Sequence, residues 1–488
     1  MSNGDIYFWE PEKNKGYSIG WNLKKIIDNG LPNFKPPKKI ENFLEQILIL
    51  IKTSEKEWSG PITFNSFDNY LASYVKDEKP SRHQLIKQIE YFFNNIKGRD
   101  AVISLDLIPR PEFNFTSNTK QILDSINDVI HEIYQRQMEK GIFEPLIVIN
   151  LFTETDWNST ILDKWIQLSY QFGQPNYQNF ITGTISPETL RPRAYKPEKS
   201  VVYLRVGGIK GNSEDQSVTG FACINLAKIA TLAKNENDFF KLVDELFDNV
   251  VELLEEKKNR IKINFLDGRM TLTRHFIDNL DWSFSVITLV GMNEALETLI
   301  DASLGNVAGK AITYKLLEHL LRRIEETQKL TGNLYSLESF PSENAGALLL
   351  KEYDSKQVTL TAATDLKSDH GDDLWDVLEH QKKFHSIYTG GTLLQIYLDR
   401  GLSYNSGLKL LLQRLIEIFG YNYFGITPLF SICPEHGYHN GELLHCLYCG
   451  GETKTYTRID NTMVEISKLP DSLKEACRRR VYYDVKNK

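Results

Sequence analysis

The chain has 488 residues, with 57 Lys or Arg and 64 Asp or Glu, which gives a formal net charge of −7. At roughly 150 residues per domain, this length allows about three domains or one large one. The 41% hydrophobic and 25% charged residues are typical of a globular protein with a large core. The small acidic excess argues against a sequence-independent nucleic-acid binder, because such proteins carry a surplus of positive charge.

The cysteine content and the N-terminus predict a cytoplasmic protein that does not enter a membrane. Five cysteines are too few for a disulfide framework, and four of them lie in the last 56 residues. The first 16 residues are acidic and aromatic, whereas a signal peptide begins with basic residues and an apolar stretch. The longest strongly apolar stretch, 47–51, is far short of the roughly 20 residues that a membrane helix needs.

Apolar residues at helical spacing predict long helices along the chain. The clearest are 40–52, 81–96, 237–258 and 310–326. The first follows the helix breaker Pro36-Pro37, and the second begins at Ser81, a residue type that caps helix N-termini.

Short runs rich in β-branched residues lie between these helices and predict strands. They include 101–108, 145–151, 200–205, 221–226, 284–289 and 392–396. Strands mixed with long helices over some 430 residues, without an internal repeat, favour an α/β sheet or barrel.

Two glycine clusters, 206–211 and 388–392, lie beside predicted strands. Glycine permits a positive φ or a close backbone approach, as a phosphate site needs. An ordinary tight turn needs the same freedom, and neither run matches a dinucleotide or Walker motif. Both interpretations stay open.

One strong chemical motif lies near the C-terminus. Cys433 and His436 form one pair with two intervening residues, and Cys446 and Cys449 form another. Two such pairs can place four ligands tetrahedrally around one zinc ion, and four protein ligands favour a structural over a catalytic site. His439 and His445 are alternative fourth ligands, but His436 has the better spacing.

Residues 425–458, GITPLFSICPEHGYHNGELLHCLYCGGETKTYTR, resemble the C-terminal zinc region of the anaerobic, class III, ribonucleoside-triphosphate reductases. Further segments resemble that family in the same order along the chain. They are 16–24, 57–71, 176–181, 289–294, 335–341 and 388–392.

The resemblance implies a ten-stranded α/β barrel made of two half-barrels over 1–425, a zinc ribbon over 426–456 and a glycyl-radical tail over 457–488. In this family, a radical-SAM activase forms a glycyl radical, which generates a thiyl radical on a finger-loop cysteine. That thiyl radical abstracts the ribose 3′-hydrogen. The resemblance also implies a homodimer. The N-terminal regulatory module of many members has no counterpart, so allostery through it is not expected.

The sequence departs from the family at both radical positions. The C-terminal pattern Ser-Arg-apolar-x-Gly-Tyr aligns with Thr457 to Thr462, which puts Asn461 in place of the glycine, and no glycine follows Gly451. In the finger loop, Ala194 and Tyr195 stand where the family has adjacent cysteines. We therefore expect no catalytic residue and no glycyl radical.

Two cysteines lie outside the zinc motif. Cys223, in a predicted strand, is the only thiol near the finger loop, but a free cysteine in a strand is more often a small buried hydrophobe than a nucleophile. Cys477 falls in a charged helix-like tail, which predicts a surface position.

The substrate region also differs. The family's Arg-Gly-Gly-Gln stretch is contracted to 97–100, and an acidic segment, 368–373, replaces its Thr-Asn-Ser loop. That segment is either a solvated turn or a second metal site. Gly207, Gly208, Asn293 and Glu338 are retained in family motifs, which makes them candidate nucleotide-binding residues or scaffold alone.

These features lead to three hypotheses. The first is a catalytically impaired family member that retains the binding of a ribonucleoside triphosphate, an intact reductase or an activase. The second is an active reductase component that receives its radical glycine in trans and uses Cys223 as the thiol. The third is a zinc-ribbon interaction protein on a barrel scaffold.

Overall fold

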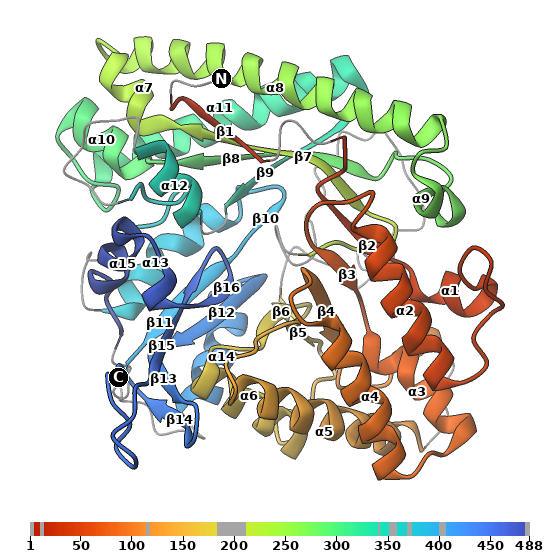
Figure 1. The fold of residues 1–488 in the computed structure, drawn as a ribbon. Helices are drawn as coiled ribbons and strands as arrows, with labels where there is room; N and C mark the ends of the chain where they lie inside the picture. Colours follow the sequence, from red (N-terminus) through yellow and green to blue (C-terminus); the bar gives the residue numbers. More distant parts are fainter. Residues whose placement is uncertain are drawn as a thin grey trace.

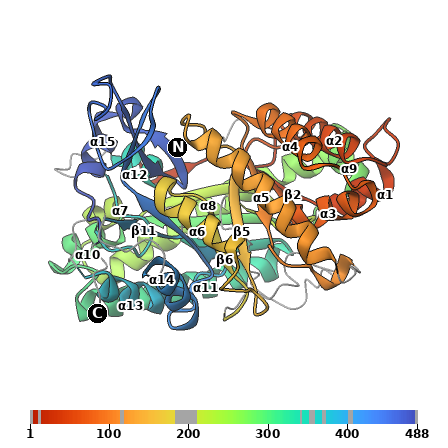
Figure 2. The same ribbon diagram turned by 90° about the horizontal axis from the view of Figure 1, so that it is seen from below.

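The computed structural model describes residues 4–9, 14–113, 118–182, 211–339, 342–350, 359–367, 373–399 and 407–483. One large sheet winds through these residues, and helices cover its outer side (Figure 1 and Figure 2). Within the described ranges, no helix is both long and apolar enough to cross a membrane.

The first half of the large sheet consists of five parallel strands connected by helices. Its elements are β2 (Ser18–Trp21), α1 (Leu23–Asn29), α2 (Ile40–Ser54), β3 (Ile62–Phe64), α3 (Phe67–Glu78), α4 (Arg82–Ile96), β4 (Ala101–Leu105), α5 (Thr119–Met138), β5 (Leu146–Leu151), α6 (Thr160–Phe172) and β6 (Asn176–Asn179). The predicted start of the second helix is confirmed: Ser81 Oγ accepts from Gln84 N, and Gln84 Oε1 accepts from Ser81 N, which forms a capping box.

The second half also alternates strands and helices. Its elements are β1 (Ile6–Phe8), β7 (Ser217–Asn225), α7 (Leu226–Leu232), α8 (Glu236–Leu266), α9 (Thr271–Phe276), β8 (Ser283–Val290), α10 (Met292–Ile300), α11 (Val307–Thr331), β9 (Leu334–Ser339), α12 (Glu343–Leu350), α13 (Leu374–His385), β10 (Gly391–Thr392), β11 (Leu394–Leu398), α14 (Gly407–Glu417) and β12 (Tyr423–Pro428). Helices α8 and α11 are longer than predicted because their buried apolar positions continue, to Phe265 in α8.

The strand order is β10-β9-β8-β7-β2-β3-β4-β5-β6-β12-β11, with β1 added beside β7. The two halves meet antiparallel, at β2 with β7 and at β6 with β12. Because only Leu393 separates β10 from β11, the two ends of this order meet and the sheet nearly closes. If β10 and β11 count as one interrupted strand and β1 is left aside, the barrel has the predicted ten strands.

Apolar side chains from both halves of the sheet form one buried cluster. Its members are Val102, Val148, Val218, Phe221, Phe284, Val286, Leu334, Leu393 and Tyr423. Since these residues come from β4, β5, β7, β8, β9 and β12, the cluster occupies the inside of the barrel, as side chains do in barrels of this size. Two larger clusters lie between the sheet and its helices.

A separate four-stranded antiparallel sheet follows the barrel, in the order β14-β13-β15-β16. Its strands are β13 (Phe430–Cys433), β14 (Gly437–Asn440), β15 (Lys454–Ile459) and β16 (Thr462–Glu465), and helix α15 (Asp471–Arg478) comes after them. Phe430 of this sheet stacks on Tyr456 and packs edge-on against Phe172 of α6, so aromatic contacts attach the small sheet to the barrel.

Candidate metal centre and barrel site

The sequence-predicted metal ligands come together at the end of the small sheet. Cys433 ends β13, and the hairpin turn to β14 places His436 beside it. The segment between β14 and β15 returns Cys446 and Cys449 to the same point. Ligand atoms of all four side chains lie within 4.8 Å of one another.

The separations within this group suit a tetrahedral metal ion. Cys433 Sγ is 3.7 Å from both His436 Nδ1 and Cys449 Sγ, and Cys446 Sγ is 3.6 Å from His436 Nδ1. Four ligands placed about 2.3 Å from one tetrahedral ion would be roughly 3.8 Å apart. The Cys₃His group could therefore bind a metal such as zinc.

The two alternative histidines lie differently. His439 Nε2 is 3.3 Å from Cys446 Sγ, and this ring is buried. The backbone of His445 forms an isolated antiparallel β-bridge with that of Glu452. Among the described residues, the group of four ligand atoms within 4.8 Å of one another contains His436 and neither His439 nor His445. The ring centre of Tyr448 lies 5.5 Å from that of His436 and 5.6 Å from that of His439.

Asn461, which the sequence resemblance predicts to stand in place of the family's radical glycine, lies at the tip of the β15–β16 hairpin. Ile459 pairs with Thr462, so Asp460 and Asn461 form a two-residue turn. Their φ values are 45° and 64°, as such a turn requires. Asn and Asp tolerate this conformation better than other residues with side chains. The backbone shape that glycine would favour is therefore kept, although a side chain is present.

The Asn461 side chain is buried and hydrogen-bonded. Its Oδ1 accepts from Asn176 Nδ2 and from Arg458 Nη1, each at 2.8 Å. Arg458 is fully buried and also donates to Thr427 Oγ1, Asn176 Oδ1 and the carbonyl of Gly173. We call this group the Arg458 network.

The Arg458 network requires a close backbone approach at Gly425 of β12. A Cβ atom there would lie 2.5 Å from Asn176 Oδ1, well inside normal contact distance. A cavity of about 230 Å³ reaches the same hairpin tip from the surface. Arg99, Phe143, Gln174 and Asn461 are among its lining residues.

Cys223 lies on β7 and is fully buried. It packs with Val290, Leu349, Leu350 and other apolar residues. Burial, and secondarily Asp460, raise the pKa of the Cys223 thiol, which disfavours a reactive thiolate. The predicted surface position of Cys477 is wrong: this side chain is buried against Leu473 because α15 packs onto the barrel.

The candidate nucleotide-binding residues that the structure describes make contacts within the fold. Asn293 Oδ1 accepts from Leu304 N at 2.8 Å. Glu338 is buried on β9, and Gly390 packs so closely that a Cβ atom would lie 2.2 Å from Glu338 Cγ. Residues 194, 195, 207, 208 and 368–372 and the predicted strand 200–205 lie outside the described residues.

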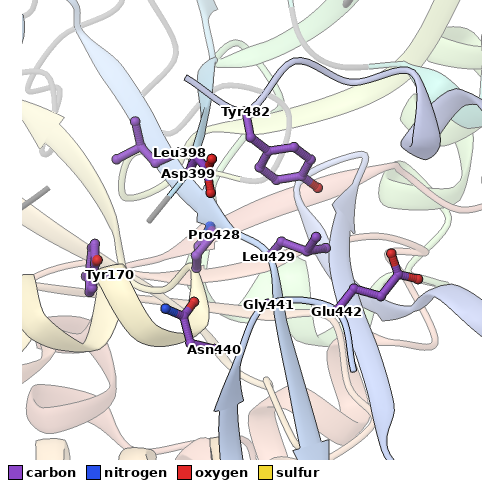
Figure 3. Close-up of a pocket in the computed structure, with 9 residues that line it drawn as sticks. All are labelled: Tyr170, Leu398, Asp399, Pro428, Leu429, Asn440, Gly441, Glu442 and Tyr482. Carbon is purple, nitrogen blue, oxygen red and sulfur yellow. The ribbon is translucent and has the colours of Figure 1, made fainter. Parts of the chain in front are cut away.

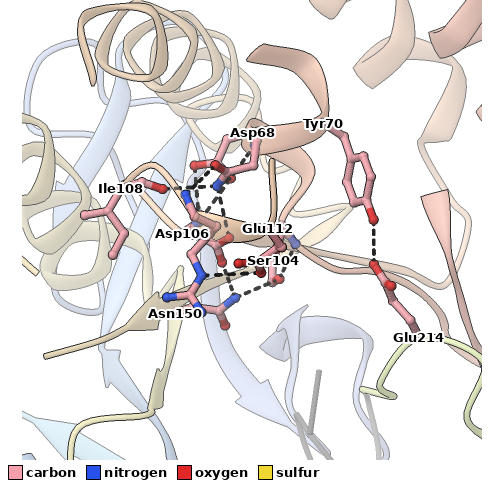
Figure 4. Close-up of polar contacts among 11 residues, drawn as sticks. Asp68, Tyr70, Ser104, Asp106, Ile108, Glu112, Asn150 and Glu214 are labelled. Atoms are coloured by element: carbon pink, nitrogen blue, oxygen red, sulfur yellow. Dashed lines mark hydrogen bonds and ion pairs between the residues drawn. The ribbon is translucent and has the colours of Figure 1, made fainter. Parts of the chain in front are cut away.

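A buried polar network, which the sequence did not indicate, joins α3 to the ends of β4 and β5 (Figure 4). Asp68 accepts from Asp106 N at 3.1 Å, and Asn150 Nδ2 donates to Asp106 Oδ1 at 2.7 Å. Burial, and then the nearby Asp106, raise the pKa of Asp68 to about 6. Tyr70 also donates to Glu214 at 3.0 Å. The contacts of Asp68, Asp106 and Asn150 hold α3, β4 and β5 of the first half-barrel together, and the Tyr70–Glu214 bond links α3 to the segment before β7.

A second cavity, of about 430 Å³, lies where the barrel, the small sheet and the C-terminal segment meet (Figure 3). Its lining residues are Tyr170, Leu398, Asp399, Pro428, Leu429, Asn440, Gly441, Glu442 and Tyr482. Its walls therefore come from α6, the ends of β11 and β12, the segment after β14 and the chain beyond α15.

Comparisons with solved structures agree on the fold. An anaerobic ribonucleotide reductase superposes with a TM-score of 0.81 at 16% identity, covering 99% of this chain and 84% of that chain. The Thermotoga maritima enzyme in complex with dATP and CTP gives a TM-score of 0.77 at 16% identity, covering 97% and 84%. The same enzyme with dATP in its specificity site gives 0.75 at 16% identity, covering 95% and 84%.

Comparison with curated proteins finds no match. A family model, described as anaerobic ribonucleoside-triphosphate reductase, matches residues 1–483. That match spans the barrel, the four-stranded sheet and helix α15, which is nearly the whole chain. The chain therefore belongs to the anaerobic ribonucleoside-triphosphate reductase family.

Proposed function

We propose that this chain is a family member without glycyl-radical chemistry that retains the binding of a ribonucleoside triphosphate or of a family partner. The observation that carries this proposal is the environment of Asn461. Its side chain is buried and accepts two hydrogen bonds in the Arg458 network. The residue at the radical position thus has a structural role.

The chemistry of the glycyl radical explains why this matters. A radical on the α-carbon of glycine is planar and delocalised between the amide and the carbonyl, and no side chain shields it. A Cβ atom on Asn461 hinders both planarity and access. Its carboxamide is in addition held by Asn176 and Arg458, so a change of geometry at the α-carbon would strain those bonds.

Two observations weigh against the alternative with a glycine in trans. The tip of the β15–β16 hairpin already fills its place, so an incoming segment would have to displace Asn461 and break the Arg458 network. Cys223 is fully buried among apolar residues, and burial raises the pKa of its thiol. Neither group is placed to react.

Nucleotide binding rests on the family and on the fold. A relative with the same fold was solved in complex with dATP and CTP, and this chain retains the strands around the barrel interior. A panel of ribonucleoside and deoxyribonucleoside triphosphates tests this part by thermal shift. A ligand at about 100 times its Kd should stabilise the protein by about 2.7 kcal/mol. If no triphosphate raises the Tm, nucleotide binding is excluded and partner binding remains.

We also propose that the Cys₃His group binds zinc in a ribbon over 426–456. Cys433, His436, Cys446 and Cys449 would hold the ion, which would crosslink the segments on both sides of β14. With four protein ligands no position stays open for water, so the ion would supply structure and not hydrolytic chemistry. We expect about one zinc per chain.

Electron paramagnetic resonance tests the loss of radical chemistry. The purified protein is incubated without oxygen with a radical-SAM activase and S-adenosylmethionine, and an intact family reductase serves as the positive control. We expect an organic radical in the control and none in this chain. A signal that appears in the wild type and is lost in the Asn461→Ala variant would overturn the proposal.

A further inference from the structure

The chain beyond the small sheet packs back onto the barrel. We call residues 471–483, which comprise α15 and the segment after it, the C-terminal strap. Its end is hydrogen-bonded to β11: Tyr483 N donates to Tyr397 O at 2.8 Å, and Asp399 N donates to Tyr483 O at 3.0 Å. Its beginning packs through Leu473, which is buried. The strap is thus fixed at both ends.

Helix α12 lies between this strap and Cys223. Ala347 of α12 packs with Leu473 and Cys477 of the strap. Leu349 and Leu350 at the end of the same helix belong to the apolar cluster around Cys223. Both ribbon views show α12 and α15 side by side (Figure 1 and Figure 2). One short helix therefore covers the thiol and is itself covered by the strap.

A buried ion pair fixes the strap to the N-terminus of α12. Arg480 Nη2 lies 3.0 Å from Glu343 Oε1, and the two side chains are only 5% and 17% exposed. Arg480 also donates to Thr457 Oγ1 at 2.9 Å, and its guanidinium lies 4.5 Å from the centre of the Tyr397 ring. Because breaking a buried pair leaves an uncompensated charge, this contact strongly favours the closed arrangement.

The tip of the β15–β16 hairpin also contacts the first turn of α12. Asp460 N donates to Glu343 Oε2 at 3.0 Å, and Asn344 Nδ2 donates to Asp460 Oδ2 at 2.8 Å. The first turn of α12 is therefore held from two sides, by the hairpin and by Arg480. Release of Arg480 would leave the Glu343 carboxylate without its cation.

We propose that the C-terminal strap is a latch that keeps α12 closed over Cys223, with the Arg480–Glu343 pair as its main fastening. Opening of the strap lets α12 move and gives reagents or a partner access to the thiol. This inference concerns access and not radical chemistry, so it does not depend on the proposed function.

Thiol labelling tests the latch on the full-length protein. Labelling by N-ethylmaleimide is followed over time at each cysteine by peptide mass spectrometry. In wild type, Cys223 should react slowly. Arg480→Gln should raise its rate by about tenfold or more, since Glu343 is then left buried without its cation. Arg479→Gln is the matched control: Arg479, the residue after α15, is 49% exposed and pairs with Glu475 of that helix, so the Cys223 labelling rate should stay within about twofold of wild type.

The reactivity of Cys477 distinguishes coupled opening of the strap and α12 from opening of the strap alone. Cys477 lies in the strap, so it reports opening of the strap itself. If Arg480→Gln exposes Cys477 but leaves Cys223 at its wild-type rate, the strap does not control α12 and the proposal is wrong. It is equally wrong if neither cysteine reacts faster.

Amide hydrogen exchange distinguishes latch opening from general unfolding. In Arg480→Gln, faster exchange should be confined to α12, the β15–β16 tip and α15, while α2 and α4 keep their wild-type rates. Faster exchange in all of these helices would mean that the variant destabilises the whole fold, and would count against a latch.

If Arg480→Gln does not fold, Arg480→Lys replaces it. Lysine keeps the charge but lacks the fork that reaches Glu343 and Thr457 together. Its Cys223 labelling rate should lie above that of wild type at an unchanged Tm. A wild-type labelling rate in a folded Arg480→Lys protein would overturn the role given to the Arg480 fork.

Discussion

The candidate metal centre and the hairpin tip belong to the same four-stranded sheet, but they differ in how strictly they depend on particular residues. Asn461 lies only 12 residues after Cys449. At the metal centre, four donor side chains still meet within 4.8 Å. At the hairpin tip the backbone forms a two-residue turn, and both turn residues, Asp460 and Asn461, carry side chains.

This difference shows which physical demand each region meets. A metal centre needs specific donor atoms, so a change of one ligand removes its chemistry and its stabilising effect together. A two-residue turn needs only residues that tolerate positive φ, and Asp460 and Asn461 satisfy that need. The fold of the hairpin therefore does not require glycine at either turn position, whereas a four-ligand metal site has no comparable freedom in its residues.

The largest expected effect is at the metal centre. In Cys446→Ser, metal content should fall from about one ion per chain to near zero, measured by elemental analysis. Amide exchange in β13 to β15 should become fast, because structural zinc contributes on the order of 10 kcal/mol to small zinc-binding folds. Cys477→Ser is the control and should retain the metal, since Cys477 lies in α15, outside the Cys₃His group.

The β15–β16 hairpin tip is held in place by the hydrogen bonds of Arg458. Arg458→Met keeps an unbranched side chain but leaves the oxygens of Asn176, Asn461 and Gly173 without this donor. We expect a loss of about 1–3 kcal/mol in the free energy of unfolding, measured by urea denaturation, because buried neutral acceptors lose their donor. Arg479→Met, at an exposed site, should change it by less than about 0.5 kcal/mol. A loss below about 1 kcal/mol for Arg458→Met would show that the buried network contributes little.

Local sequence patterns predicted much of the fold. The helix start at Ser81 and the four long helices are confirmed because helical spacing and capping are local properties. Helix α8 extends beyond its predicted end because burial at Ile261 and Phe265 depends on tertiary contacts. For the same reason Cys477 was misplaced: the charged composition of its helix did not reveal that one face packs onto the barrel.

The metal group could be predicted because its spacing brings the ligands together through two short turns. The Arg458 network could not be predicted, since Arg458 meets Asn176 across a sequence separation of 282 residues. Likewise, the Arg480–Glu343 pair spans 137 residues. Such contacts arise only when the antiparallel closure of the barrel brings the C-terminal segments against β6 and α12.

Protection of the hairpin tip and metal binding at the Cys₃His group should respond to pH in opposite directions. Burial, and then Glu343, raise the pKa of Asp460 well above its usual value of about 4. An acid with a raised pKa in the folded state loses its stabilising contribution as pH rises through that pKa. Protection of the hairpin tip, corrected for intrinsic exchange, should therefore fall with rising pH. Metal binding should instead weaken as pH falls, because protons compete for the ligands.

Asp460→Asn isolates the hairpin part of that response. Asparagine tolerates the same positive φ and cannot ionise, so the pH dependence of protection at the tip should flatten. Metal retention as a function of pH should be unchanged. A wild-type slope in Asp460→Asn would assign the effect to another group near the tip.

The smallest expected effect distinguishes the contributions of the backbone and of the side chain of Asn461 to stability. Asn461→Gly removes the two accepted hydrogen bonds but relieves any strain at φ 64°, whereas Asn461→Ala removes the same bonds and keeps a Cβ atom. We expect urea denaturation to show Ala about 1 kcal/mol less stable than Gly, the usual difference at a positive φ. Both should be less stable than wild type, because Arg458 and Asn176 lose a buried acceptor. If Gly equals or exceeds wild type, the side chain of Asn461 does not stabilise the hairpin, and the structural role given to it here is wrong.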